Sequence, residues 1–264
     1  MKIIAEKING TRKSVARAIV ERDLEFIQTL AVKQANAGAA WLDVNAGTHP
    51  DEEPVDLVWL IETIQAVVET PLCLDSANPE ALKDGIQKVN KTPMINSING
   101  ELDRLEKILP IVAKHGCEVI ALAMGGRKIP ETQEQRVEMI ETIMSATQAA
   151  GVPDEKVYVD PLAMTIATSN KSAVVACETI RAVKEKFPEV HFTMGLSNIS
   201  FGLPARKQIN RGLLILAMQA GLDSAILDPL DEDLQAAILT TELLLGRDKH
   251  CLNYIKAAKS GRFG

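Results

Sequence analysis

The segment that decides the fold is MGLSNISFGLPARKQINR, residues 194–211. The apolar run leading into it predicts a buried strand over 192–198, and the residues from Arg206 onward predict a helix. The glycines, serines, asparagine and proline between them are typical of a turn that exposes backbone N–H groups and short polar side chains. Ligands of α/β proteins bind where a strand ends and a helix begins. The same glycines would also suit a loop without a ligand, so the other strand ends must decide.

Short apolar runs alternate with longer amphipathic segments along the chain. The predicted strands cover 3–8, 41–46, 71–76, 94–99, 119–124, 157–162, 192–198 and 224–228. The predicted helices cover 12–37, 52–69, 79–89, 101–115, 132–150, 171–187, 205–220 and 233–246. Continuously apolar strands are typical of buried parallel sheets. Eight such units predict one (β/α)8 barrel domain over 1–264, with a short C-terminal tail from about residue 248. A doubly wound sheet would need edge strands and a topological break, which the pattern lacks.

Composition excludes several classes of function. Apolar residues make up 46% of the 264 residues and aromatic residues only 3%, so the core must be aliphatic. Few aromatic residues and a net charge of -6 argue against nucleic-acid binding, which uses stacking platforms and basic surfaces. The N-terminus has no signal-peptide pattern, and no apolar run approaches the length of a membrane span. We therefore expect a cytoplasmic protein with no membrane partner.

The cysteines give no sign of a metal site. They are scattered at positions 73, 117, 177 and 251. Without a CxxC pair or a Cys/His cluster, neither a zinc site nor a disulfide framework is expected. Residues 248–253, DKHCLN, approach the DxHxxG signature of corrinoid-binding domains but lack its glycine and a following Rossmann sequence, so we interpret this match as chance. We predict that the chain itself binds no metal.

Carboxylates or carboxamides end seven of the eight predicted strands. They are Glu6 with Asn9, Asp43 with Asn45, Asp75, Asn96, Asp160, Asn198 and Asp228, and Met124 ends the remaining strand. A helix N-cap would explain one such residue, but Asp75 precedes a helix that Asn78 already caps. Carboxylates accept hydrogen bonds, whereas carboxamides donate and accept them. We predict a neutral or cationic ring rich in N–H donors, with Asp75 and Asp160 on an amidine-like edge and Asn96 on a carbonyl or ring nitrogen.

Conventional catalytic groups are scarce at these strand ends. Of the four histidines, only His49 falls in a loop near the expected mouth of the barrel. No Ser-His or Cys-His nucleophile is assembled, and no lysine ends a strand to form a Schiff base. A central phosphate would require a glycine-rich loop with basic residues, and the cluster beginning at Arg206 would serve one acidic group at most. The expected site therefore orients its ligand but holds few proton carriers.

Several segments resemble the pterin-binding methyltransferase family, and most closely its methyltetrahydrofolate:corrinoid protein methyltransferases. These segments are LDVNAGT (42–48), CLDS (73–76), PMINSIN (93–99), VDPL (159–162), GLSNISFGLP (195–204) and INR (209–211). The resemblance runs from AEKING (5–10) to the last predicted barrel helix. The family's fold is a (β/α)8 barrel, in agreement with the predicted strands.

The resemblance implies roles for particular residues. Asp75, Asn96 and Asp160 would bind the pterin ring, and Asn198 would hydrogen-bond the reactive N5 atom. Asn198 is the candidate catalytic residue, because a neutral amide can either donate to N5 or accept from it. The predicted substrate-binding set is Asp75, Asn96, Met124, Asp160, Gly195, Asn198 and Arg206.

The implied reaction moves a methyl group between N5 of tetrahydrofolate and the cobalt of a corrinoid. Because the chain is too short to hold a corrinoid domain as well, we expect a separate corrinoid protein to dock over the barrel mouth. Some family members have glutamine three residues after the asparagine, where this chain has Phe201. That departure favours transfer from methylcorrinoid to tetrahydrofolate. We also expect a homodimer.

Two alternatives remain open. Residues 205–207, ARK, resemble a serine-arginine-lysine segment of dihydropteroate synthase, another pterin-binding barrel. That enzyme must bind a pyrophosphate, for which no lysine ends a strand here. The other alternative is a non-catalytic folate-binding subunit. Such a subunit would need Asp75, Asn96 and Asp160, but it would have no use for Asn198.

Overall fold

The strands form one parallel sheet that curves into a barrel. The computed structural model describes residues 1–126 and 129–261. The strands are β1 (Lys2–Asn9), β2 (Trp41–Asn45), β3 (Leu72–Asp75), β4 (Met94–Ile98), β5 (Glu118–Leu122), β6 (Val157–Asp160), β7 (His191–Phe192) and β8 (Ser224–Leu227). Their order in the sheet is β7-β6-β5-β4-β3-β2-β1-β8. A parallel bridge between Gly195 and Ile226 joins the two ends, which confirms the predicted (β/α)8 barrel.

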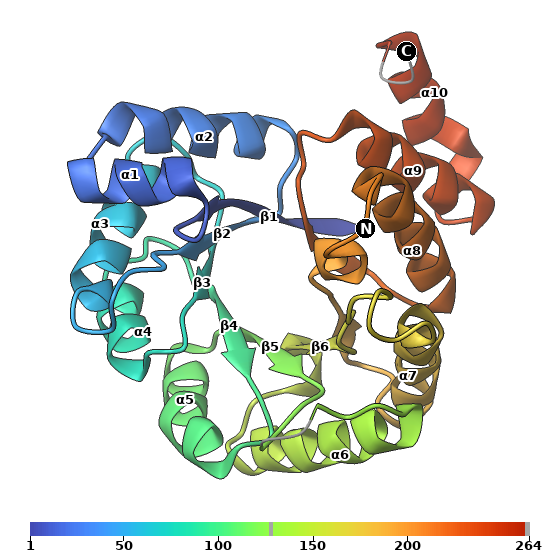
Figure 1. The fold of residues 1–264 in the computed structure, drawn as a ribbon, viewed down its shortest axis with the longest axis horizontal. Helices are drawn as coiled ribbons and strands as arrows, with labels where there is room; N and C mark the ends of the chain where they lie inside the picture. The colour runs from blue at the N-terminus through green and yellow to red at the C-terminus, as the bar shows by residue number, and fades with distance from the viewer. Residues whose placement is uncertain (127–128, 262–264) are drawn as a thin grey trace.

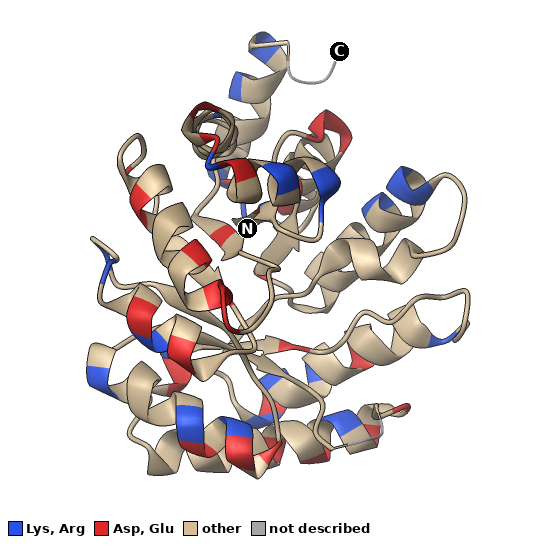
Figure 2. Ribbon diagram, turned by 60° about the vertical axis from the view of Figure 1, so that its left-hand side comes forward, with Lys and Arg blue, Asp and Glu red and all other residues tan. Residues whose placement is uncertain are grey.

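Helices surround the strands as an outer ring (Figure 1). They are α1 (Lys13–Glu21), α2 (Leu24–Asn36), α3 (Glu53–Gln65), α4 (Pro79–Ile86), α5 (Leu102–His115), α6 (Gln133–Ala149), α7 (Ser172–Lys186), α8 (Arg206–Ala220), α9 (Glu232–Leu244) and α10 (Leu252–Lys259). Short 3-10 turns are η1 (Asp154–Lys156), η2 (Leu196–Ser200) and η3 (Lys249–Cys251). Acidic and basic residues intermix on the outer helices in the view of Figure 2. This distribution is unlike the single-sign surface of a polyanion-binding protein.

Two predicted elements differ from those observed. The predicted helix over 12–37 is two helices, because Arg22 adopts a left-handed conformation with φ 54° and Asp23 caps α2 through the Phe26 N–H. The predicted strand over 192–198 ends at Phe192. The chain then turns into η2, where the Asn198 N–H donates to the Gly195 carbonyl at 3.2 Å. Asn198 therefore lies on a turn above the strand end and not on the strand itself.

The tail beyond Asp248 forms a helix that packs against α9. Asp248 caps this segment, because its carboxylate accepts hydrogen bonds from the backbone N–H groups of Asn253 and Tyr254. A capping role accounts for this aspartate without any corrinoid.

The barrel interior is filled by one apolar layer. Its members are Ile4, Trp41, Cys73, Met94, Ile120 and Tyr158, and all are buried. Side chains alternate across a strand, so residues two positions further along also point inward. In β2, β3, β4 and β6 those residues are Asp43, Asp75, Asn96 and Asp160. The sequence thus builds a polar layer directly above an apolar plug.

Candidate active site

The polar layer gathers its groups at the carboxyl ends of neighbouring strands. Asp75 of β3 lies in register with Asn96 of β4, and Leu122 of β5 lies in register with Asp160 of β6. Two carboxamides support the carboxylates. Asn45 Nδ2 donates to Asp75 Oδ2 at 2.9 Å, and Asn96 Nδ2 donates to Asp43 Oδ1 at 3.3 Å. The mouth therefore presents a connected set of hydrogen-bond acceptors.

One amide oxygen in this set has no partner. Asn45 Oδ1 is buried and makes no hydrogen bond in the structure. Leaving a buried acceptor unsatisfied costs about 1–3 kcal/mol, so each such group needs an explanation, of which a bound ligand is one. Because Asn45 donates its Nδ2 to Asp75, its oxygen is left for an N–H donor of a ligand. The orphaned atom lies beside Asp75, one of the carboxylates that the sequence predicted to meet such donors.

Burial favours the protonated form of these carboxyl groups over the ionised form. It raises the pKa of Asp160 to about 6, although backbone N–H groups of Leu162 and Gly195 and the charge of Arg136 lower that pKa in part. Burial, and after it the charge of Asp75, raises the pKa of Asp43 well above its usual range. Burial also raises the pKa of Asp75, and the hydrogen bond from Asn45 opposes the rise. N–H donors of a ligand would therefore stabilise the ionised form of carboxyl groups that burial keeps protonated.

The loop that carries Asn198 is fixed from two sides. Ser197 Oγ donates to Glu6 Oε2 at 3.1 Å, and Arg206 Nη2 donates to the Ser197 carbonyl at 2.7 Å. Arg206 Nε also donates to Ser200 Oγ at 3.0 Å. These contacts leave the Asn198 side chain exposed above the mouth. A Cβ added to Gly195 would lie 2.8 Å from Asn198 Nδ2, so the glycine makes room for that amide.

The structure brings most of the predicted site residues together. Asp75, Asn96 and Asp160 line the mouth, and the loop with Gly195 and Asn198 follows β7 at the same end. Met124 is half-buried two residues beyond the end of β5. Arg206 differs from the expectation in its contacts, since its guanidinium holds the 195–200 loop. The ligand-binding roles of all these residues stay predictions.

Two arginines that the sequence analysis missed support the mouth from outside. Arg104 of α5 donates to the carbonyls of Ser76, Ala77 and Ser97, at 2.6–2.9 Å. Ser76 and Ala77 follow Asp75 in the loop after β3, whereas Ser97 lies within β4 next to Asn96.

Arg136 of α6 is the second of these arginines and is buried. It donates to the carbonyls of Pro130, Pro161 and Leu162, at 2.6–3.1 Å, in the loops after β5 and β6. Arg104 thus ties the loop after β3 to the end of β4, and Arg136 ties the loops after β5 and β6 together.

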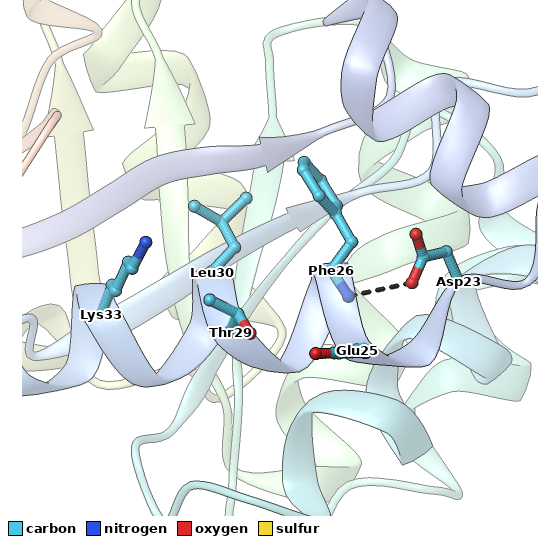
Figure 3. A pocket seen from close by; sticks show the side chains of 6 residues that line it. All are labelled: Asp23, Glu25, Phe26, Thr29, Leu30 and Lys33. Carbon is cyan, nitrogen blue, oxygen red and sulfur yellow. Dashed lines mark hydrogen bonds between the residues drawn. The ribbon is translucent and has the colours of Figure 1, made fainter.

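A hollow on the outside of the barrel is separate from this mouth. It has a volume of about 370 Å³ and lies on α2 (Figure 3). Its lining residues are Asp23, Glu25, Phe26, Thr29, Leu30 and Lys33. None of the mouth residues contributes to it. The chemistry expected of the chain therefore belongs to the mouth and not to this hollow.

The described ranges, 1–126 and 129–261, contain no group of three or more His, Cys, Asp or Glu side chains that could hold a metal ion. No helix within them is long and apolar enough to cross a membrane. His49, the histidine expected near the mouth, is exposed, and its Nδ1 lies 3.5 Å from Asp51 Oδ2. The proton-carrying groups of the mouth are its carboxyls.

Residues 5–228 match the family described as pterin binding enzyme. The chain belongs to the pterin-binding enzyme family. A methylcorrinoid:tetrahydrofolate methyltransferase of Eubacterium limosum is 40% identical over 266 residues, covering 100% of this chain and 98% of that protein. The methionine synthase of Mycobacterium tuberculosis is 32% identical over 85% of this chain, which corresponds to 20% of that larger protein.

Solved structures show the same barrel in other pterin-binding enzymes. Dihydropteroate synthase of Yersinia pestis, with a pterine-sulfa conjugate, superposes with a TM-score of 0.69 at 15% identity, covering 93% of each chain. Dihydropteroate synthase of Xanthomonas albilineans, in complex with 7,8-dihydropteroate, has a TM-score of 0.67 at 18% identity, covering 92% of each chain. At such low identity these structures support the fold and not the reaction.

Proposed function

We propose that this pterin-binding enzyme transfers a methyl group from a methylated corrinoid protein to N5 of tetrahydrofolate. The observation that carries the proposal is the orphaned Asn45 Oδ1 beside Asp75, in a mouth that also holds Asp160 and, above it, the amide of Asn198. The full-length relative that acts on methylcorrinoid and tetrahydrofolate supports the same reaction.

The ring would bind through its N–H groups. A pterin carries a 2-amino group beside ring nitrogens and a carbonyl, which is the amidine-like edge that acceptor carboxylates match. Asp75 and Asp160 accept from that edge, and Asn45 Oδ1 accepts a further N–H. Asn96, whose amide already donates to Asp43, meets the ring with its remaining polar atoms. The apolar plug below excludes water from beneath the ring.

Asn198 acts on the reacting nitrogen. The partner's corrinoid supplies an electrophilic methyl group and keeps the electron pair of the cobalt–carbon bond that breaks. The N5 electron pair forms the new bond to the methyl carbon, and the N5 proton leaves to water at the open mouth. The oxygen of the Asn198 amide accepts the N5–H as positive charge develops on it. In the reverse direction N5 first takes a proton from water, and the same N5–H donates to the amide oxygen while the methyl group leaves.

The mouth is where the partner must approach, because Asn198 is exposed there. The corrinoid protein therefore docks over the loops that follow the strands. The homodimer and the cytoplasmic location stay predictions. Sedimentation equilibrium of the purified protein tests the first.

The test mixes the protein, tetrahydrofolate and a methylated corrinoid protein, and follows the cobalt absorption spectrum as the methyl group leaves. We expect demethylation of the corrinoid and formation of 5-methyltetrahydrofolate in equal amounts. The matched control omits tetrahydrofolate. Demethylation at the same rate in that control would contradict the proposal.

Dihydropteroate synthase activity is the alternative that the shared fold suggests. In the part of the chain that the structure describes, no lysine ends a strand at the mouth to meet a pyrophosphate, and the exposed Lys207 pairs with Asp231, with 3.2 Å between Nζ and Oδ2. The absence of a lysine at these strand ends favours the methyltransferase. Synthesis of pteroate from a pterin pyrophosphate and p-aminobenzoate would reverse the preference.

A further inference from the structure

Phe201 exposes an aromatic ring beside the candidate active site. Its side chain is 69% exposed. The other aromatic residues in the described part of the chain are buried or half-buried: Phe26, Trp41, Trp59, Tyr158, Phe187, Phe192 and Tyr254. Because most of the Phe201 side chain is exposed, it adds little buried apolar surface to the folded monomer.

The exposure does not come from a loose attachment. The Phe201 N–H donates to the Asn198 carbonyl at 3.2 Å, and the Phe201 carbonyl accepts from Thr165 Oγ1 at 2.7 Å. The loop after β6 is joined to η2 as well, because the Ile166 N–H donates to the Ile199 carbonyl at 3.0 Å. Phe201 is therefore held at a fixed place relative to Asn198.

Other apolar side chains are exposed on the same half of the mouth. Ile129 follows β5 and is 44% exposed, and Leu230 follows β8 and is 37% exposed. Ile166, after β6, is half-buried. We call Ile129, Ile166, Phe201 and Leu230 the apolar rim. A single exposed apolar residue is ordinary, but a set that flanks a reactive group is typical of a binding surface.

The reaction itself identifies the occupant. Methyl transfer requires the cobalt-bound carbon and N5 to approach to about 3–3.5 Å. The corrin macrocycle around the cobalt must then cover the surface next to Asn198. It is a broad ring with apolar faces and with methyl and amide groups at its edge, and the faces and methyl groups suit an aromatic side chain and aliphatic neighbours.

We propose that Phe201 contacts the corrin macrocycle of the methylated partner and, with the rest of the apolar rim, forms the surface on which that partner docks. This inference rests on the proposed methyl transfer. Two other occupants would make different predictions. The p-aminobenzoyl tail of the folate would link Phe201 to folate affinity, and a second copy of this chain would link it to oligomeric state.

The experiment compares Phe201→Ala and Phe201→Leu with wild type in the methyl-transfer assay. The matched control is Leu244→Ala, since Leu244 is 77% exposed at the end of α9 and far from the mouth. We expect Phe201→Ala to raise KM for the methylcorrinoid protein about tenfold, as truncation of interface aromatics commonly does. Phe201→Leu should raise it less, and Leu244→Ala should not change it. The calorimetric Kd for tetrahydrofolate and the thermal midpoint should stay at wild-type values in all three.

Several results would overturn the assignment. An unchanged KM for the corrinoid protein in Phe201→Ala would show that the ring makes no productive contact. A tenfold weaker tetrahydrofolate affinity would assign Phe201 to the folate tail, and a change in sedimentation would assign it to a dimer interface. If the wild-type protein transfers no methyl group, the proposed function fails and this inference falls with it. If wild type is active and Phe201→Ala is indistinguishable from it, only this inference fails.

Discussion

Replacing Asp160 with asparagine should weaken folate binding and at the same time stabilise the fold. Burial raises the pKa of Asp160 from 3.8 to about 6. In the folded protein the carboxyl therefore holds its proton at pH values where the unfolded chain has already released it. The contribution of Asp160 to the free energy of unfolding is therefore highest below about pH 4 and falls as the pH rises to about 6. The difference between 3.8 and about 6 corresponds to roughly 3 kcal/mol lost by neutral pH.

Asparagine removes that ionisation but keeps an oxygen for the backbone N–H groups of Leu162 and Gly195. We expect Asp160→Asn to gain stability at pH 7.5, by less than roughly 3 kcal/mol because the amide also loses the attraction of Arg136. Denaturant unfolding at pH 7.5 and pH 4 measures this gain, which should be absent at the lower pH.

Folate affinity should respond in the opposite sense. The carboxylate accepts N–H donors, whereas the carboxylic acid carries a proton of its own. Tetrahydrofolate should bind about tenfold more weakly at pH 5 than at pH 7.5, because only about a tenth of Asp160 is ionised at pH 5. In Asp160→Asn the affinity at pH 7.5 should fall by about 2–3 kcal/mol, and the part of the pH dependence that Asp160 causes should disappear. Calorimetry across pH 5–8 is the assay. A variant that is both less stable and equally pH-dependent in binding would refute this account of Asp160.

Four further outcomes are expected at the mouth. Asp75→Ala should lose about 2–3 kcal/mol of tetrahydrofolate binding, measured by calorimetry, since it removes the acceptor paired with Asn45. Asn198→Ala should transfer the methyl group on the order of 10²–10³ more slowly at saturating folate while binding it only about tenfold more weakly, and a wild-type stopped-flow rate would leave Asn198 as a binding residue alone. Gly195→Ala keeps an allowed backbone conformation but crowds Asn198 Nδ2, so the rate at saturation should fall on the order of tenfold with little loss of folate affinity. Elemental analysis of the purified protein should find no stoichiometric cobalt or zinc.

The strands were predictable because buried parallel strands leave a strong apolar pattern. Two predicted elements were wrong where short polar or charged residues changed the local backbone conformation. Met194 and Leu196 alternate as in a strand, yet the residues from Leu196 to Ser200 form η2. The segment 12–37 looks like one amphipathic helix in the sequence. In the structure α1 ends at Glu21, Arg22 is left-handed, and Asp23 caps α2.

The acceptor groups of the mouth could also be predicted, because strand parity sends Asp75 and Asp160 inward with the residues two positions before them. The contacts of the arginines could not be predicted. Arg104 and Arg136 look like ordinary polar positions on α5 and α6, and only the packing of those helices reveals which loops they reach. Arg206 was predicted to lie near the mouth. Its contacts to Ser197 and Ser200 could not be predicted, because they depend on η2, which was predicted as a strand.

These three arginines solve a problem that the acidic mouth creates. Rigid loops are needed to aim Asp75, Asn96, Asp160 and Asn198 at one ring, and basic side chains are the obvious means of tying acidic loops together. An arginine that hydrogen-bonded the carboxylates directly would satisfy the acceptors intended for the ligand. Instead, the hydrogen bonds of Arg104 and Arg136 go to backbone carbonyls, and those of Arg206 go to a carbonyl and a hydroxyl. The charges of Arg104 and Arg136 still lower the pKa values of Asp75 and Asp160 in part, while the carboxylate oxygens stay available for N–H donors.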